Sequence, residues 1–212
     1  MMLEKYKHIS FDLDGTLVHT ISDYRYQIVP FVIKKLNGVL PSLSAVDEFW
    51  FEANRDETIL KKFKLSPETF WQLFKQVDTP RRRSKCTFAY HDVEDCFWRL
   101  NKFGKLVSII TGAPIWISKM EVRKLNNAPV DFYLATTAHK RLKTKPDPSG
   151  MYYVLEKLAV SAKETVYIGN SNEDAIFAKN SGVDFIYLER KEHKFYLKDR
   201  AIAIIKTLNE LY

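Results

Sequence analysis

Two aspartates, Asp12 and Asp14, stand two positions apart just after a short apolar-alternating run at residues 6–10. In an extended segment, side chains at positions i and i+2 point to the same side, so both carboxylates can project together where a strand ends. Gly15 then lets the backbone turn sharply or approach a ligand closely. Two like charges held this close repel each other unless a cation or a shared proton intervenes. The pair therefore predicts a metal site; the alternative is a plain acidic turn in which one aspartate caps the next helix.

Later polar groups also follow predicted strands. Thr111 and Gly112 end the apolar stretch at residues 107–110, just before a helix that begins near Pro114. A threonine hydroxyl and backbone N–H groups at a helix start are suited to hold phosphoryl oxygens, although the same dipeptide also forms ordinary turns. Lys145 lies in a Lys-Pro-Asp-Pro stretch, and its amine could pin a phosphate oxygen and balance the acidic pair. The alternative for this lysine is plain exposure among neighbouring lysines.

A further strand, at residues 166–168, leads into the stretch Gly-Asn-Ser-Asn-Glu-Asp. This stretch places Asn170 four positions before Asp174 at the start of a predicted helix. A carboxylate and an amide oxygen can both coordinate a hard cation, but the neutral amide attracts it less. Both side chains could instead cap the helix, and that role is compatible with metal binding.

The elements that position these residues follow from hydrophobic periodicity. After a predicted helix at residues 91–103, short apolar strands alternate with amphipathic helices from residue 106 onward, which predicts a parallel sheet with helices on both faces. With the strand at residues 7–12, the predicted fold class is α/β, a Rossmann-like three-layer α/β/α core. The other predicted strands lie at residues 106–110, 131–134, 166–168 and 185–188, and the predicted helices at residues 91–103, 115–125, 151–158, 172–180 and 201–211.

The block between the first strand and residue 88 reads as helical. Its apolar stripes, one of which includes Ala53, are more typical of a plain core than of a cofactor pocket. The basic run that follows Pro80 reads as a return linker. The predicted helices span residues 22–37, with a break or kink at Pro30, residues 44–63, and a segment that begins at Ser66 and Pro67.

This arrangement predicts two domains. The core comprises residues 1–17 and 89–212, and an inserted helical cap comprises residues 18–88. Because the cap follows the carboxyl end of the first strand, where open α/β sheets bind ligands, it is placed to act as a lid.

Composition narrows the class of protein. The chain has 212 residues, of which 46% are hydrophobic, and a formal net charge of +7 at pH 7. It contains no apolar run of membrane-spanning length and no apolar signal segment, so we expect a cytoplasmic protein without a membrane partner. Cys86 and Cys96 indicate buried thiols in a reducing compartment rather than a disulfide framework. The basic run at residues 81–85 is by default a solvated loop; the alternative is help in binding a multiply charged substrate.

Four of these stretches resemble the motifs of one family. Residues 11–17, Phe-Asp-Leu-Asp-Gly-Thr-Leu, resemble motif I of the haloacid dehalogenase-like (HAD) hydrolase superfamily. The strand that ends at Thr111 resembles motif II, and the stretch at Lys145 resembles motif III. Residues 169–174 resemble motif IV, except that Asn170 replaces its first acid. The insertion after motif I resembles the C1-type cap of the subfamily that includes phosphoglycolate phosphatase.

The resemblance implies a magnesium-dependent phosphomonoester hydrolase that acts on a small phosphorylated metabolite through a phospho-aspartate. Asp12 would be the nucleophile, and Asp14 would be the general acid and then the general base. The implied Mg²⁺ ligands are Asp12, the backbone carbonyl of Asp14, Asn170 and Asp174. The implied phosphate-binding residues are Gly15, Thr16, Thr111, Gly112 and Lys145.

Other functions stay open to different degrees. Asp14 argues against dehalogenase-type and phosphonatase-type sites, which lack the second acid of motif I. Thr16 favours a phosphatase over a sugar phosphomutase, which usually has valine at that position. A non-catalytic phosphate-binding or partner-binding protein with the same fold is a further alternative, and Asn170 supports it. We do not expect nucleic-acid binding through residues 81–83, because no nucleic-acid motif is present. The sequence leaves the substrate and the oligomeric state open.

Overall fold

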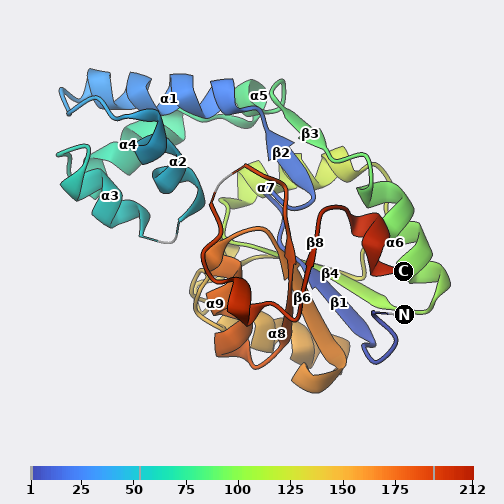
Figure 1. Ribbon diagram of the computed structural model, residues 1–212. Helices are drawn as coiled ribbons and strands as arrows, with labels where there is room; N and C mark the ends of the chain where they lie inside the picture. Colours follow the sequence, from blue (N-terminus) through green and yellow to red (C-terminus); the bar gives the residue numbers. More distant parts are fainter. Residues whose placement is uncertain (1, 53, 193) are drawn as a thin grey trace. The chain divides into compact units, whose positions relative to one another are not determined.

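The computed structural model of the protein describes residues 2–52, 54–192 and 194–212, which form two compact units. The core unit comprises Met1–His19 and Phe88–Tyr212, and the cap unit comprises Thr20–Thr87. Figure 1 follows the chain through both units from blue to red. Each unit encloses an apolar cluster of its own.

A parallel sheet forms the middle of the core unit. Within the described residues it has six strands in the order β5-β4-β1-β6-β7-β8, and every neighbouring pair is parallel. The strands are short and rich in β-branched and aromatic residues, which favour an extended backbone that is buried on both faces. β1 lies between β4 and β6, with His8 opposite Leu106 and Thr165. The strands are β1 His8–Phe11, β4 Leu106–Thr111, β5 Phe132–Ala135, β6 Thr165–Gly169, β7 Asp184–Leu188 and β8 Ala203–Ile205.

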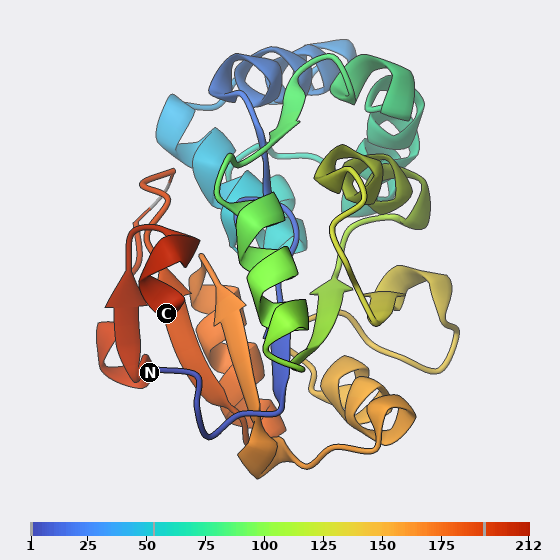
Figure 2. The same cartoon turned by 90° about the vertical axis from the view of Figure 1, so that its right-hand side faces the viewer.

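Helices cover both faces of this sheet (Figures 1 and 2). Ile109 belongs to the apolar cluster that contains Phe97 of α6, whereas its neighbour Ile110 belongs to the cluster that contains Met151 of α8 and Phe177 of α9. Neighbouring side chains of one strand therefore pack against different helices, as the two-residue period of a strand requires. This three-layer α/β/α arrangement confirms the predicted fold class. The helices of the core unit are α6 Val93–Lys102, α7 Ile115–Val122, α8 Ser149–Leu158 and α9 Asn172–Ser181.

The cap unit is built from helices around an aromatic centre. The ring centroids of Phe49 and Phe70 lie 5.2 Å apart, and those of Phe49 and Phe63 lie 5.7 Å apart, within the range of favourable aromatic pairs. Two short paired strands, β2 Val18–Thr20 and β3 Thr87–Ala89, connect the cap unit with the core unit in sequence. The helices are α1 Ser22–Lys35, α2 Leu43–Phe51, α3 Arg55–Lys61, α4 Pro67–Val77 and α5 Pro80–Arg83.

Three details of the cap unit differ from the sequence prediction. α1 runs through Pro30, so of the break or kink predicted there the break does not occur; the buried face of α1, which includes Val32 and Ile33, offsets the one backbone hydrogen bond that a proline removes. The single helix predicted at residues 44–63 is two helices, α2 and α3, whose apolar sides reach the same cluster. Ala53, which the predicted stripe included, lies outside the described residues.

The third difference is the predicted return linker, which contains α5 and β3. Pro80 occupies the first helical position, where its missing N–H costs nothing. The Thr79 hydroxyl accepts a hydrogen bond from the Arg82 N–H at 3.4 Å and so caps this turn. Local capping therefore makes a helical turn out of a segment whose charge alone suggests a loop.

The helix predicted at residues 201–211 is also wrong. Ala203–Ile205 forms β8, in which Ile204 lies opposite Tyr187 of β7. Adjacent isoleucines favour an extended backbone, and a free sheet edge was available to pair with them. Thr207 then begins a separate turn through a capping box with Glu210. Short 3-10 helices at Lys198–Arg200 and Leu208–Leu211 flank the strand.

Candidate active site

The loop after β1 begins with Asp12, whose backbone N–H donates to the Ile168 carbonyl at 2.9 Å. This bond continues the β1–β6 pairing by one residue, so Asp12 lies at the carboxyl end of the sheet's central strands. Its side chain is buried. Its Oδ2 accepts from the Thr16 hydroxyl at 2.9 Å, and its Oδ1 accepts from Lys145 Nζ at 2.6 Å. A hydroxyl and an ammonium group thus fix the orientation of the carboxylate.

Lys145 connects two carboxylates. Its Nζ donates to Asp12 Oδ1 at 2.6 Å, to Asp174 Oδ1 at 2.7 Å and to the Tyr167 hydroxyl at 3.2 Å, and all four side chains are buried. Burial by itself lowers the pKa of Lys145, but the charges of Asp12 and Asp174 raise it well above its usual value. Burial, with a smaller effect of Asp174, raises the pKa of Asp12 to about 7, while Lys145 and Thr16 act in the opposite direction. The lysine is therefore the positive charge that lets two carboxylates share a dry site.

Asp174 is positioned by the first turn of α9. Its Oδ2 accepts from the backbone N–H groups of Asn170 and Ser171, each at 3.1 Å, and from the Ser171 hydroxyl at 2.7 Å. The Ser171 hydroxyl in turn accepts from the Asp174 N–H, which completes a capping box. A Cβ at Gly169 would lie 2.5 Å from Asp174 Cγ, so only glycine fits there. Asp174 thus caps the helix with one oxygen and contacts Lys145 with the other.

Asn170 is buried beside the motif I loop. Its Oδ1 accepts from the Thr16 hydroxyl at 3.2 Å, whereas its Nδ2 has no hydrogen-bond partner among the described residues. Gly15 has a φ of +86°, and a side chain there would collide with the Asn170 amide, so both its conformation and its neighbour require glycine. The same Thr16 hydroxyl contacts Asp12 Oδ2, so a carboxylate oxygen and an amide oxygen converge on one small region.

These residues fit a hard divalent cation. The side-chain donors available from Asp12, Asn170 and Asp174 are all oxygens, the ligand type that Mg²⁺ prefers. The buried Asn170 Nδ2, which has no hydrogen-bond partner among the described residues, is an N–H donor, so it can bond only to an acceptor such as water or a phosphate oxygen and not to the cation. In the described part of the chain, no three His, Cys, Asp or Glu side chains gather at metal-binding distance. The reason is chemical: one position holds an amide, and Lys145 occupies the space between the two aspartates.

Thr111 and Gly112 make a tight turn at the end of β4. The buried Thr111 hydroxyl accepts from the Ala113 N–H at 3.1 Å. An added Cβ at Gly112 would meet only Thr144, at 3.9 Å, so space alone does not require glycine there. Among the described residues, no hydrogen bond connects this turn with Asp12 or Lys145. The structure therefore places motif II at the same end of the sheet as Asp12, without a hydrogen bond that joins it to Asp12 or Lys145.

Asp14 lies half-buried two residues after Asp12, and its backbone forms an isolated bridge with Val18. Its charge lies close enough to His19 to raise the pKa of that imidazole, although burial and Arg190 lower it more. Asp14 is thus held by the tight loop that Gly15 allows, with its charge near the aromatic ring of His19.

Two residues that contact this site carried no recognised signal in the sequence. Tyr167 lies inside β6 and contacts Lys145; a tyrosine in the middle of a buried apolar strand is itself a hint, because its hydroxyl needs a partner. Arg190, two residues after β7, donates through Nε and Nη2 to the Thr16 carbonyl at 3.2 and 3.1 Å. The same guanidinium donates to both carboxylate oxygens of Asp92, at 2.9 and 2.8 Å. It therefore fixes the motif I loop from a segment far away in the sequence.

Comparisons with known proteins agree on one family. The family model "Haloacid dehalogenase-like hydrolase" matches residues 9–188. The phosphoglycolate phosphatase of Vibrio cholerae is 24% identical over 197 residues, which cover 85% of this chain and 83% of that protein. The phosphoglycolate phosphatase of Colwellia psychrerythraea is 25% identical over 205 residues, which cover 89% of this chain and 86% of that protein.

Solved structures share the fold. A crystal structure from Bacteroides fragilis, described as a haloacid dehalogenase-like hydrolase, superposes with a TM-score of 0.81 at 21% identity and covers 98% of this chain and 100% of that one. A crystal structure of a hydrolase from Pseudomonas syringae has a TM-score of 0.79 at 16% identity and covers 97% of this chain and 95% of that one. Across the described residues, no helix has both the length and the apolar character needed to span a bilayer. Since the family model covers most of the sequence, this chain belongs to the haloacid dehalogenase-like hydrolases.

Proposed function

We propose that this protein is a magnesium-dependent phosphatase that hydrolyses the phosphomonoester of a small metabolite through a phospho-aspartate at Asp12. The observation that carries the proposal is the buried Asp12 carboxylate, held by Lys145 at 2.6 Å and Thr16 at 2.9 Å where β1 ends. The relatives named phosphoglycolate phosphatase support a phosphoric monoester as the substrate class.

In the proposed reaction, an Asp12 oxygen attacks phosphorus and forms a P–O bond while the ester P–O bond breaks. Asp14 gives its proton to the departing alkoxide and later takes a proton from the water that attacks the phospho-aspartate. That second attack releases inorganic phosphate and restores the Asp12 carboxylate. Because only the ionised carboxylate attacks, a pKa of about 7 at Asp12 makes the contact with Lys145 important for reactivity at neutral pH.

Lys145 has a second role in this proposal. A phosphoryl group that approaches Asp12 carries negative charge, and an ammonium group already directed at Asp12 and Asp174 can also neutralise a phosphate oxygen. We assign Gly15, Thr16, Thr111 and Gly112 to the remaining phosphate oxygens, through backbone N–H groups and the two threonine hydroxyls.

The donors that would hold Mg²⁺ are the Asp12 carboxylate, the Asp14 backbone carbonyl, Asn170 Oδ1 and Asp174. When bound, Mg²⁺ offsets the negative charge that an anionic nucleophile and a phosphate bring together. Asn170 lowers the negative charge of this set by one relative to an aspartate, so we expect weaker binding of the cation than a fully acidic set gives.

The test is release of inorganic phosphate from a chromogenic aryl phosphate and from a panel of phosphorylated metabolites that includes 2-phosphoglycolate. We expect turnover that requires Mg²⁺, that EDTA abolishes, and that Asp12→Asn abolishes without changing the melting temperature by more than a few degrees. Asp199→Asn, the same change at an exposed aspartate, is the control and should leave the rate unchanged. If no member of the panel is hydrolysed, the proposal is wrong.

One observation favours a second candidate, a non-catalytic phosphate-binding protein. Asn170 stands where motif IV has an acid, and Lys145 already bonds to both Asp12 and Asp174, so this arrangement is compatible with phosphate binding without turnover. Phosphate binding by the wild-type protein, without release from any ester, would support this candidate.

A further inference from the structure

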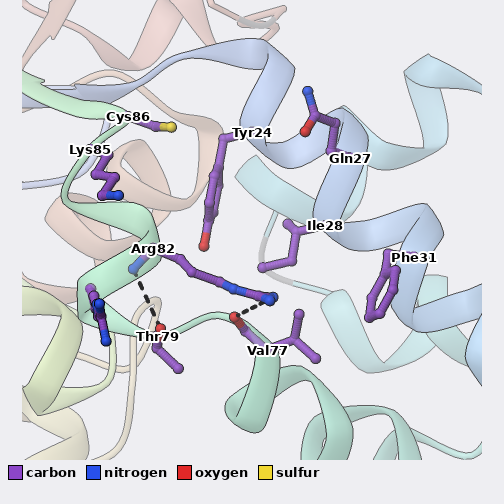
Figure 3. A pocket seen from close by; sticks show the side chains of 10 residues that line it. Tyr24, Gln27, Ile28, Phe31, Val77, Thr79, Arg82, Lys85 and Cys86 are labelled. Carbon is purple, nitrogen blue, oxygen red and sulfur yellow. Dashed lines mark hydrogen bonds between the residues drawn. The ribbon is translucent and has the colours of Figure 1, made fainter.

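A pocket of about 620 Å³ is lined only by residues of the cap unit (Figure 3). It is distinct from the catalytic cluster, by which we mean Asp12, Lys145, Asp174 and the residues in contact with them. Residues of α1 line one side of it, and residues between the end of α4 and Cys86 line the other. Its volume falls within the range of small-molecule sites, roughly 300 to 1,000 Å³. Nothing in the proposed reaction uses this pocket.

The charge of the pocket is one-sided. Arg81, Arg82 and Lys85 line it, and no carboxylate does. These three side chains are exposed, and none of them forms an ion pair with a described carboxylate. The pocket therefore offers three cations to a ligand, which favours an anion with at least two negative charges.

The neighbouring Arg83 differs from these three cations because it has a carboxylate partner. It is buried and donates to both oxygens of Asp78, at 3.0 and 2.7 Å. The Tyr24 hydroxyl also donates to Asp78, at 2.8 Å. Asp78, which lies between the lining residues Val77 and Thr79 in the sequence, thus bonds to Arg83 and Tyr24 rather than to a cation of the pocket.

The opposite side of the pocket is apolar and aromatic. It contains Tyr24, Ile28 and Phe31, and the Phe31 ring is 45% exposed and thus accessible to a ligand. Figure 3 shows the Arg82 side chain extended along the pocket toward Val77, whose carbonyl accepts from Arg82 Nη1 at 3.5 Å. A ring placed here would contact aromatic carbon on one side and a guanidinium on the other, and both contacts are favourable.

We propose that this pocket binds an aromatic phosphate of the nucleotide class. The phosphate lies against Arg81, Arg82 and Lys85, and the ring lies against Tyr24 and Phe31. This site depends only on residues of the cap unit, so it is independent of the proposed phosphatase chemistry and exists whether or not Asp12 is a nucleophile.

The experiment is isothermal titration calorimetry of adenosine 5′-monophosphate into the full chain. All proteins carry Asp12→Asn and the buffer contains EDTA, so that the nucleotide survives, and chromatography afterwards confirms that it is intact. Ribose 5-phosphate and adenosine are titrated separately, because the first has only the phosphate part and the second only the ring. Arg82→Ala/Lys85→Ala removes two pocket cations, and Lys34→Ala/Lys75→Ala removes two exposed cap lysines that do not line the pocket.

We expect the nucleotide to bind more tightly than either fragment, and Arg82→Ala/Lys85→Ala to weaken it by at least about tenfold, while Lys34→Ala/Lys75→Ala changes it by less than about twofold. Phe31→Ala should weaken binding of the nucleotide but leave ribose 5-phosphate unchanged. Circular dichroism melts verify that the variants are folded. Equal affinity of the two double variants, or no nucleotide binding at millimolar concentration, would overturn the proposal, because binding at the catalytic cluster alone does not respond to residues 82 and 85.

Discussion

Lys145 is the residue on which the electrostatics of the site depend. Taking a carboxylate out of water is costly, and two buried carboxylates within reach of each other also repel. Asp12 and Asp174 tolerate this arrangement because one ammonium group lies 2.6 and 2.7 Å from their nearest oxygens. In the proposed reaction, a metal ion and a substrate phosphate would both have to fit around a lysine that already bonds to two carboxylates.

Asn170 is the residue at which this chain departs from the family's acidic motif, and it gives the first prediction. Asn170→Asp adds a carboxylate where an amide oxygen now accepts from Thr16. We expect this variant to bind Mg²⁺ about tenfold more tightly, measured by calorimetric titration, because the added charge attracts the cation.

The same substitution should lower stability when the cation is removed. In EDTA, the new carboxylate lies near Asp12 and repels it, so the melting temperature should fall below that of the wild type, and Mg²⁺ should restore it. Asn172→Asp, a change of equal charge at the first residue of α9, is the comparison. Equal or weaker Mg²⁺ affinity of Asn170→Asp would remove Asn170 from the proposed ligand set.

At the scale of elements, β1 positions the site because hydrogen bonds to both neighbouring strands fix it at its first position and just beyond its last. His8 at its first position contacts Ser108 Oγ of β4 at 2.7 Å and Thr165 Oγ1 of β6 at 3.2 Å. Asp12 just beyond its last position bonds to Ile168. Three strands are thus in register at both ends, and this register brings Asp12 to the residues that follow β6.

The buried His8 predicts a loss of stability in acid. Burial lowers its pKa from 6.5 to about 4, so between these pH values the unfolded chain binds a proton that the folded chain does not. Stability therefore falls as the pH decreases from 6.5 to 4, by about 3 kcal/mol from this group. Urea unfolding at a series of pH values measures the slope, and His8→Asn should make it shallower in this window. An unchanged slope in the variant would show that His8 is not the group responsible.

The segment after β7 supplies a second constraint on the site. Arg190 donates to the Thr16 carbonyl and pairs with Asp92, which also accepts from the Thr207 hydroxyl at 2.8 Å and the Leu208 N–H at 2.9 Å. Burial raises the pKa of Asp92, but the contacts with Arg190, the Leu208 N–H and the Thr207 hydroxyl together bring that pKa below its usual value, so this carboxylate stays ionised at neutral pH. One ion pair thereby connects the motif I loop with the C-terminal turn.

Arg190→Met should therefore loosen the motif I loop, although Arg190 itself is not proposed to contact a substrate. We expect kcat for a phosphomonoester to fall on the order of tenfold, because Thr16 loses the group that holds its carbonyl and Asp12 loses the support of Thr16. Arg190→Lys should recover little, since an ammonium group cannot bond to Thr16 and to both oxygens of Asp92 together. Arg99→Met, which removes an exposed arginine of α6, should leave kcat unchanged. Activity of wild-type level in Arg190→Met would contradict this positioning role.

At the scale of the whole molecule, the parts of the fold that local pattern decides were predictable. Spacing and residue type account for the motif I loop, for the alternation of strands and helices after residue 105, and for the end of α6 just before Gly104. The misassigned segments are those that tertiary contacts decide: β8 pairs along an open sheet edge, and α1 continues through Pro30 because its apolar face is buried. The contacts of Arg190 and Tyr167 could not be predicted for the same reason, because each forms them only when segments distant in the sequence come together.

The cap unit and the core unit enclose separate apolar clusters, so we expect the two units to respond separately to loss of packing. Phe70 is fully buried among the aromatic rings of the cap unit, and Phe177 is fully buried in the core unit. Phe70→Ala should destabilise its own unit by about 3 kcal/mol or more, because the lost ring leaves a cavity. Hydrogen–deuterium exchange followed by mass spectrometry should then show faster exchange in peptides from residues 20–87, with peptides from β1, β4 and β6 unchanged. Phe177→Ala is the matched control and should give the reverse pattern. Equal acceleration of exchange in both units by either variant would mean that the chain opens as one cooperative body, and that the cap unit is not an independently stabilised part of the protein.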